Sequence, residues 1–355
     1  MSRRSRRQRG KLLEARREKK EKEIKAQLQL EMERRRQANL KPKPHKIGKR
    51  KTALLFAAAH SKHDRHQPDV GVSVTTRVRT IHLSSSPHPS WREMEKIQLH
   101  PVNPLDLHAE EDEGVPANLT GMAVDYLTRM ALTGENAAKT FDIACLGFVN
   151  SIYMCEDQYF ETFYQLLNEV DELHESGSAD WIRLAAYPAL ALVTCDSLYR
   201  AGTGTPFHLK DGTVVPWISD RTCLPVTSHN IDEMVHRGIK LFENYDPLVA
   251  AEITFQGGYT GIIASGDGDY LTENTLWDFK VSIKEPNNRQ LLQLLVYWQM
   301  GLKSIHPEFQ KVKFLALFNP RTNTIYRLST DQVSPECVQW LQNDVIGYGN
   351  GMPQF

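Results

Sequence analysis

One short stretch of the sequence holds charged residues whose types and spacing could support metal-dependent chemistry. It reads GDGDYLTENTLWDFK and contains Asp269, Asp278 and Lys280. A hairpin whose two-residue loop is Glu273–Asn274 would place Asp269 directly opposite Asp278. Directly opposed residues of an antiparallel pair hold their Cβ atoms about 4.5–5.5 Å apart, so the two carboxylates would repel each other. A divalent cation shared by the two groups would remove that repulsion.

Lys280 is expected on the same face of the strand pair as Asp278, because alternate residues of a strand point the same way. Trp277 and Phe279 are apolar and predict that the opposite face of this strand is buried. Partly buried charges usually have a charged partner or a metal ion. The alternative is an Asp–Lys ion pair on an exposed strand, which would contribute little to stability.

A calcium-binding loop beginning at Asp267 is excluded by the residues that follow its DGD opening. Leu271 and Thr272 stand where such a loop requires an oxygen ligand and a glycine. The acidic stretch is therefore interpreted as part of a different kind of site.

The elements predicted around this stretch alternate between helices and strands. Apolar residues at helical spacing predict helices at 228–246 and 287–304. Strand-forming runs lie at 250–255, at 259–271 with an interruption at 265–269, at 275–282 and at 311–320, with 321–329 as a hairpin partner. The order α-β-β-β-α-β predicts an α+β fold with a mixed sheet.

The chain before this core, which we place at residues 206–355, divides by composition into three regions. Residues 1–51 contain 21 Lys and Arg against 6 Asp and Glu, a net charge of +15, and are predicted to form a basic helical arm. Residues 52–115 are expected to hold a strand at 70–83 and linker sequence, and residues 116–205 a helical subdomain. The rest of the chain carries −15, so the overall charge of zero conceals a basic arm on an acidic body. Binding of a polyanion by the arm and a merely solvated helix both fit this composition.

Three motifs in sequence resemble the PD-(D/E)XK nuclease superfamily, particularly its RecB-like exonuclease branch. They are G-x-x-D at Gly266–Asp269, D-x-K at Asp278–Lys280 and Q-x-x-x-Y at Gln293–Tyr297. The order of predicted elements agrees with the core of that superfamily, an α/β restriction-endonuclease-like fold. The same stretch is similar to a group of uncharacterised bacterial proteins. The resemblance covers roughly residues 230–330, less than a third of the chain.

The resemblance implies roles for individual residues. Asp269 and Asp278 would be metal ligands, and Lys280 would orient or help deprotonate the attacking water. Gln293 and Tyr297, which share one face of a helix, would steady the lysine and contact the nucleic-acid strand. The alternative for this last pair is a hydrogen bond on the helix surface without a catalytic role.

A further metal ligand has two candidates. His236 resembles a helical histidine of the RecB-like branch, and Glu252 on the first strand is its rival for that position. The expected cofactor is Mg²⁺ or Mn²⁺, because carboxylate oxygens suit hard cations. No iron–sulfur cluster is expected, because the branch members that carry one bind it through cysteines downstream of the core, where only Cys337 lies here.

These features predict a divalent-metal-dependent nuclease that hydrolyses phosphodiester bonds, in DNA rather than RNA, with the basic arm aiding nucleic-acid binding. A catalytically inactive nucleic-acid-binding module and an interaction protein on the same fold are the alternatives. No run approaches the roughly 18 uninterrupted apolar residues of a membrane helix, and no apolar segment follows the charged N-terminus. The protein is therefore expected in the cytoplasm, without membrane contact.

Overall fold

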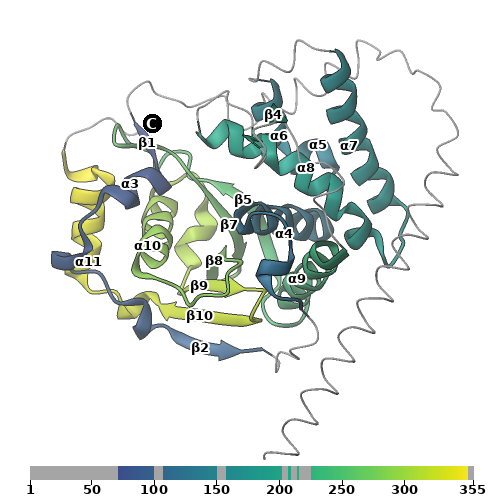
Figure 1. The fold of residues 1–355 in the computed structure, drawn as a ribbon. Helices are drawn as coiled ribbons and strands as arrows, with labels where there is room; N and C mark the ends of the chain where they lie inside the picture. Colours follow the sequence, from purple (N-terminus) through teal and green to yellow (C-terminus); the bar gives the residue numbers. More distant parts are fainter. Residues whose placement is uncertain are drawn as a thin grey trace, which may run out of the picture.

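The computed structural model describes residues 71–99, 107–149, 157–201, 207–208, 214–215 and 225–350. The basic arm predicted at residues 1–51 lies outside these ranges, so its helix stays a prediction. Within the described ranges the fold is α+β, with helices on both faces of a mixed sheet (Figure 1).

The main sheet comprises six strands of the described chain, in the order β2-β10-β9-β8-β7-β5. They are β2 (Glu95–Gln98), β5 (Leu248–Thr254), β7 (Asp267–Thr272), β8 (Thr275–Phe279), β9 (Phe314–Asn319) and β10 (Thr324–Ser329). β8 and β9 run parallel and are connected by helix α10 (Asn288–Lys303), whereas the other neighbours are antiparallel. With α9 (Pro225–Asn244) before β5, the predicted order of helix, three strands, helix and strand is observed, and β10 is the hairpin partner of β9.

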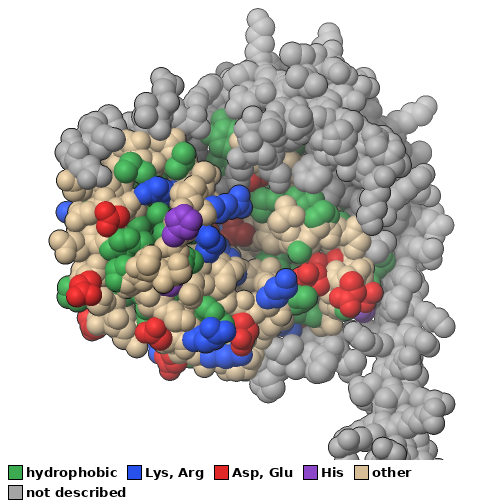
Figure 2. Space-filling view, turned by 60° about the vertical axis from the view of Figure 1, so that its left-hand side comes forward, with side chains coloured by type: hydrophobic (Ala, Val, Ile, Leu, Met, Phe, Trp, Pro, Cys, Tyr) green, Lys and Arg blue, Asp and Glu red, His purple; other side chains and the backbone are tan. Residues whose placement is uncertain are grey.

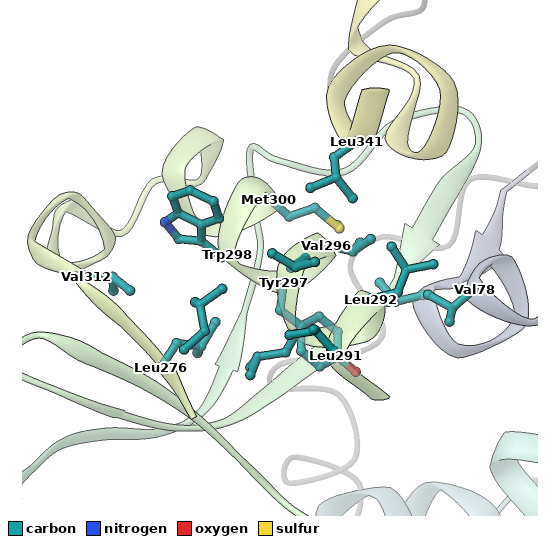
Figure 3. Packing of buried hydrophobic residues seen from close by; sticks show 14 of the residues in the cluster. Val78, Leu276, Leu291, Leu292, Val296, Tyr297, Trp298, Met300, Val312 and Leu341 are labelled. Atoms are coloured by element: carbon teal, nitrogen blue, oxygen red, sulfur yellow. The ribbon is translucent and has the colours of Figure 1, made fainter. Parts of the chain in front are cut away.

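Alternation along β8 assigns its residues to the two faces of the sheet. Leu276 belongs to the apolar cluster under α10, which Figure 3 shows from close by. Trp277 and Phe279 point the other way and contact Phe242 of α9. Asp278 therefore emerges on the α10 side, as the sequence pattern predicts.

A second group of helices precedes α9 in the chain, within the region predicted to be a helical subdomain. These are α4 (Ala117–Thr133), α5 (Ala137–Thr140), α6 (Asp142–Val149), α7 (Asp157–Glu175) and α8 (Trp181–Ala201). Ile231, Met234 and Val235 of α9 are buried in the apolar core of this group. Because Leu241 and Phe242, further along α9, pack on the sheet, α9 joins the helical part to the sheet.

The strand predicted at 70–83 is wrong for most of its length. Only Val72–Ser73 form a strand, β1, which pairs in parallel with β6 (Ile263–Ser265), and Val74–Thr80 form helix α3. The two buried valines of α3 stand four residues apart, a spacing that satisfies a helical period as well as alternation. A serine cap at the first turn decides in favour of the helix.

Shorter elements complete the described chain. They are β3 (Phe207–His208) paired with β4 (Val214–Val215), α11 (Pro335–Trp340), a π-helical turn at Leu341–Ile346, and 3₁₀ turns at Leu83–Ser85, Trp91–Glu93, Glu110–Asp112, Pro307–Lys311, Thr330–Gln332 and Tyr348–Asn350. No helix in the described part of the chain has the combination of length and hydropathy that a membrane crossing requires.

Candidate active site

The β7–β8 hairpin brings the two predicted carboxylates together at the end of its ladder. The pairing Tyr270↔Trp277 has the predicted register, and one further step of that register sets Asp269 against Asp278. Burial raises the pKa of Asp269 well above its ordinary value, and the negative charges of Asp278 and then Asp125 raise it further. The expected repulsion between the two carboxylates is therefore present.

Lys280 follows the last residue of β8 and directs its ammonium group at Asp278. Its Nζ is 2.5 Å from Oδ2 of Asp278, whose side chain is 2% exposed against 25% for the lysine. That oxygen is buried, and the ammonium group of Lys280 is the partner that it meets. Burial opposes the charge of Lys280, but Asp278 and Asp269 outweigh it and raise the pKa of the lysine, which keeps it protonated at neutral pH.

Asp269 is held by the backbone of the opposite strand. Its Oδ2 accepts a hydrogen bond from the amide N of Phe279 at 2.7 Å. This amide lies beyond the last residue pair of β7 and β8, and the carboxylate of Asp269 serves as its acceptor. Part of the side chain remains accessible to solvent, although burial is the largest cause of its raised pKa. One oxygen is thus fixed while the group stays reachable from outside.

Helix α10 places Gln293 and Tyr297 on one face, as expected from their spacing. Nε2 of Gln293 donates a hydrogen bond to Oη of Tyr297 at 2.7 Å. Burial raises the pKa of Tyr297 well above its ordinary value, and the charges of Asp267, Asp278 and Asp269 add to this effect. The phenol therefore stays protonated next to the acidic group.

Glu252 and His236 contact residues other than Asp269 and Asp278. Glu252 is skipped by the ladder of β5 and β7, between the pairs Ala251↔Tyr270 and Ile253↔Gly268, and has a positive φ of 50°. Its Oε1 forms an ion pair with Nη1 of Arg129 at 3.1 Å, and both side chains are buried. His236 lies on α9, where its Nδ1 is 2.9 Å from the carbonyl oxygen of Asp232. The assignment of either residue as a metal ligand stays a prediction.

Helix α3, in the segment predicted to be a strand, lies beside the GDGD motif. A Cβ added to Gly266 would come 2.7 Å from Cγ2 of Val74, so the motif needs glycine where the helix approaches it. Nε2 of Gln293 lies 3.4 Å from Oγ1 of Thr75 on the same helix. No local pattern in the sequence indicates that this segment returns to the site, because the contact joins residues about 200 positions apart.

Asp125 on α4 is a site residue that the sequence reasoning missed. Its Oδ1 and its main-chain oxygen both accept from Oη of Tyr270, at 2.8 and 3.0 Å. Its charge raises the pKa values of Asp269 and of Lys280. The residue stands in an ordinary amphipathic helix outside the three motifs, so no sequence signal identifies it.

The fit of these residues to a divalent cation can be tested on the geometry. The described residues contain no group of three or more His, Cys, Asp and Glu side chains arranged to hold a metal ion. Mg²⁺, however, usually keeps several waters and is bound through only one or two carboxylates. Asp269 and Asp278 would therefore be enough protein ligands for this ion. The effect of the charge of Asp278 on Asp269 also fits a cation, whereas Oδ2 of Asp278 already meets the ammonium group of Lys280. On the face drawn in Figure 2, an acidic side chain lies deep in a hollow with Lys or Arg side chains beside it.

Comparisons with protein-family models, with curated proteins and with solved structures find no match for this chain.

Proposed function

We propose that this protein is a divalent-metal-dependent nuclease of the PD-(D/E)XK type, which hydrolyses phosphodiester bonds in DNA on a restriction-endonuclease-like core. The observation that carries the proposal is the group of Asp269, Asp278 and Lys280, in which two carboxylates repel each other and an ammonium group contacts one of them. Strongly shifted pKa values caused by burial together with specific charges are concentrated at functional sites.

Asp269 and Asp278 are the residues that would hold Mg²⁺ or Mn²⁺. When bound, such an ion lowers the pKa of a coordinated water and offsets negative charge at the phosphate. Both carboxylates must be ionised to take part, and the raised pKa of Asp269 means that protons compete for this position. Activity should therefore fall as the pH is lowered toward the pKa of that group.

Lys280 supplies a positive charge at the same position of the sheet. As an ammonium group it can donate hydrogen bonds to a phosphate oxygen or to the attacking water, and it stabilises the charge that builds up on the phosphate in the transition state. Gln293 and Tyr297 are hydrogen-bonded to each other beside it, and their polar groups are suited to orient the lysine and the substrate strand.

The basic arm supplies the attraction for phosphate that the rest of the chain lacks. Residues 1–51 carry +15 and the remainder −15, so the body alone would repel a polyanion. The chain that follows the arm enters the described structure at β1, which pairs with β6 immediately before the GDGD motif. Binding of nucleic acid should consequently weaken steeply as salt is added.

The test is a cleavage assay with the full-length protein on labelled single- and double-stranded DNA and RNA, with Mg²⁺, Mn²⁺, Ca²⁺ or EDTA. We expect cleavage of DNA with Mg²⁺ or Mn²⁺, and a loss of about 100-fold or more in Asp278→Asn. Lys284→Met, which changes an exposed lysine of the loop after β8, is the matched control and should cleave normally.

Full cleavage in excess EDTA, or by Asp278→Asn, would exclude this site. Cleavage of RNA alone would change the substrate class. Binding of nucleic acid without cleavage at every metal would favour the alternative of a catalytically inactive binding module on the same fold.

A further inference from the structure

Helices α3 and α10 lie side by side and run in opposite directions. Nε2 of Gln293 is 3.4 Å from Oγ1 of Thr75, near the start of α3. Four residues earlier in α10, Nη1 of Arg289 donates to the main-chain oxygens of Val78 at 2.6 Å and of Arg79 at 3.0 Å, near the end of α3. The two helices therefore meet at two levels, one helical turn apart.

The first level adjoins the GDGD motif. A Cβ built on Gly266 would lie 2.7 Å from Cγ2 of Val74 on α3 and 3.5 Å from Cε1 of Tyr297 on α10. Helix α3 is fixed in this place by Arg77, whose Nε donates to the main-chain oxygen of Val345 at 2.9 Å. The surface shared by the two helices thus begins where the motif with the first carboxylate begins.

The polar groups of the first level are hydrogen-bond donors. Nε2 of Gln293 donates to Oη of Tyr297 at 2.7 Å as well as to Oγ1 of Thr75. A hydroxyl oxygen that accepts a hydrogen bond keeps its own hydrogen, which it can donate. Thr75 is exposed, and Gln293 is partly exposed. This level can therefore donate hydrogen bonds to a phosphate oxygen.

The second level carries positive charge. Arg79 stands four residues after Thr75 and shares its face of α3, and Arg289 stands one turn before Gln293 on α10. Both arginines are exposed. The bonds from Arg289 to α3 use Nη1, and a guanidinium group carries further N–H donors on Nη2 and Nε. The charged level lies about 5.4 Å along the helix axes from the first.

The two helices differ in charge from the rest of the body. Within their described bounds neither contains Asp or Glu, whereas α3 holds Arg77 and Arg79, and α10 holds Arg289 and Lys303. The chain after residue 51 carries −15 in total. The side of Figure 1 on which α3 and α10 lie comes forward in Figure 2, which shows Lys and Arg side chains beside the hollow. A local basic surface of this kind attracts a polyanion to one place on an acidic body.

We propose that α3 and α10 together bind the phosphate backbone of the DNA strand on one side of the cleaved bond. Thr75 and Gln293 contact the phosphate nearer to the carboxylates, and Arg79 and Arg289 contact the next one. This inference rests on the proposed nuclease function and deepens it, because it places the substrate strand. It also gives a role to α3, which lies outside the three motifs.

The test is binding of fluorescein-labelled single-stranded and duplex DNA by the full-length protein, measured by fluorescence anisotropy in EDTA at several salt concentrations. Arg79→Gln removes one phosphate contact, so the slope of log affinity against log salt should become shallower by about one. Affinity should fall roughly fivefold at low salt, and the loss should shrink as salt is added. Arg79→Lys keeps the charge and should keep the slope.

Lys303→Gln is the matched control, because it removes one positive charge from an exposed side chain at the other end of α10. About ten residues separate Lys303 from Gln293, which corresponds to roughly 15 Å along the helix. The control should leave affinity and slope unchanged. Equal losses in Arg79→Gln and Lys303→Gln would mean that the net charge alone attracts DNA, and would overturn the proposed surface.

A neutral phosphate shows where on the DNA the contact lies. In the original chain with Mg²⁺, one methylphosphonate next to a given bond, on its 5′ or its 3′ side, should slow cleavage of that bond about fivefold. Arg79→Gln should lose this sensitivity, because the two changes remove the same contact. Additive losses would overturn the contact. If Arg79→Gln does not fold, the original chain alone decides, since cleavage unaffected by a methylphosphonate on either side would overturn the surface.

The outcomes separate this inference from the proposed function. Unchanged affinity and slope in Arg79→Gln would overturn the surface and leave the nuclease proposal in place. A reduced slope in Arg79→Gln, in a chain that binds DNA but cleaves it with no metal, would support the surface and overturn the nuclease proposal. Absence of DNA binding by the original chain would overturn both.

Discussion

The ammonium nitrogen of Lys280 lies 2.5 Å from Oδ2 of Asp278, an oxygen that is buried in the protein. A cation held by Asp278 would meet this positive charge at short range, and like charges at such distances repel strongly in a partly buried site. In the proposed reaction Lys280 would therefore have two opposed effects, because it would assist the chemistry and compete with the metal ion for the same carboxylate.

The first prediction separates these two effects in Lys280→Met. Cleavage should fall about 100-fold or more, because the charge that stabilises the transition state is lost. Mn²⁺ affinity should rise roughly tenfold, because its competitor for Asp278 is removed. Single-turnover cleavage and isothermal titration of Mn²⁺ measure the two quantities on one preparation.

Lys284→Met is the control for both measurements, since it removes an exposed lysine from the loop that follows β8. It should change neither cleavage nor Mn²⁺ affinity. Weaker metal binding in Lys280→Met would contradict the competition, because it would mean that the lysine supports the site in the absence of substrate.

The second prediction concerns stability and pH. Burial and the charges of Asp278 and Asp125 raise the pKa of Asp269, so the folded state binds this proton more tightly than the unfolded chain does. The stability that follows is present below the ordinary pKa of aspartate, near 3.8, and is lost as the pH rises through the raised value. At neutral pH without metal, Asp269→Asn should therefore be more stable than the original chain, by about 0.5–2 kcal/mol.

Urea unfolding in EDTA between pH 4 and pH 8 would measure this difference, and Mn²⁺ should stabilise only the chain that retains Asp269. Asp331→Asn is the control, because Asp331 is exposed in the turn after β10. Equal stability of Asp269→Asn and the original chain across this range would show that the raised pKa has no energetic consequence.

How far the sequence predicts this molecule depends on whether a feature is local. The loop at Glu273–Asn274 determines the register of β7 and β8, and the alternation of Trp277 and Phe279 with Asp278 determines the faces. Both follow from a few neighbouring residues, so the opposition of the carboxylates and the place of Lys280 could be predicted. The pairing of α10 residues Gln293 and Tyr297 is local in the same sense.

The features that could not be predicted depend on contacts between distant parts of the chain. Glu252 lies in β5 but has a positive φ, and its carboxylate forms an ion pair with Arg129, more than a hundred residues earlier. Asp125 reaches the site only because α4 packs on α9 and on β5. The sequence of helix α3 predicts a strand because its two buried valines fit either period, and the cap at Ser73 favours the helix.

The third prediction concerns the buried pair of Arg129 and Glu252, whose side chains are 7% and 4% exposed. Arg129→Met leaves the carboxylate of Glu252 buried without its partner, which typically costs about 3–5 kcal/mol of unfolding free energy. Addition of Glu252→Gln should recover most of this loss, because no isolated charge then remains. Lys139→Met is the control, since its partner Glu135 and the lysine are much more exposed, and it should cost less than about 1 kcal/mol. Equal losses of unfolding free energy in Arg129→Met and Lys139→Met, measured by urea unfolding, would contradict the prediction.

The fourth prediction tests whether the hydroxyl group of Tyr297 takes part in catalysis or only in packing. Tyr297→Phe keeps the ring against Phe255 and removes the hydrogen bond from Gln293. If the hydroxyl orients the lysine and the substrate strand, kcat should fall about tenfold while Mn²⁺ affinity stays the same. Tyr348→Phe is the matched control, because it removes a hydroxyl that donates to the carbonyl oxygen of Gly258 at 2.6 Å, a residue outside β7 and β8. Both variants lose one partly buried hydrogen bond, so a drop in kcat confined to Tyr297→Phe cannot be explained by stability. An equal drop in both would show that the hydroxyl of Tyr297 acts only on the fold.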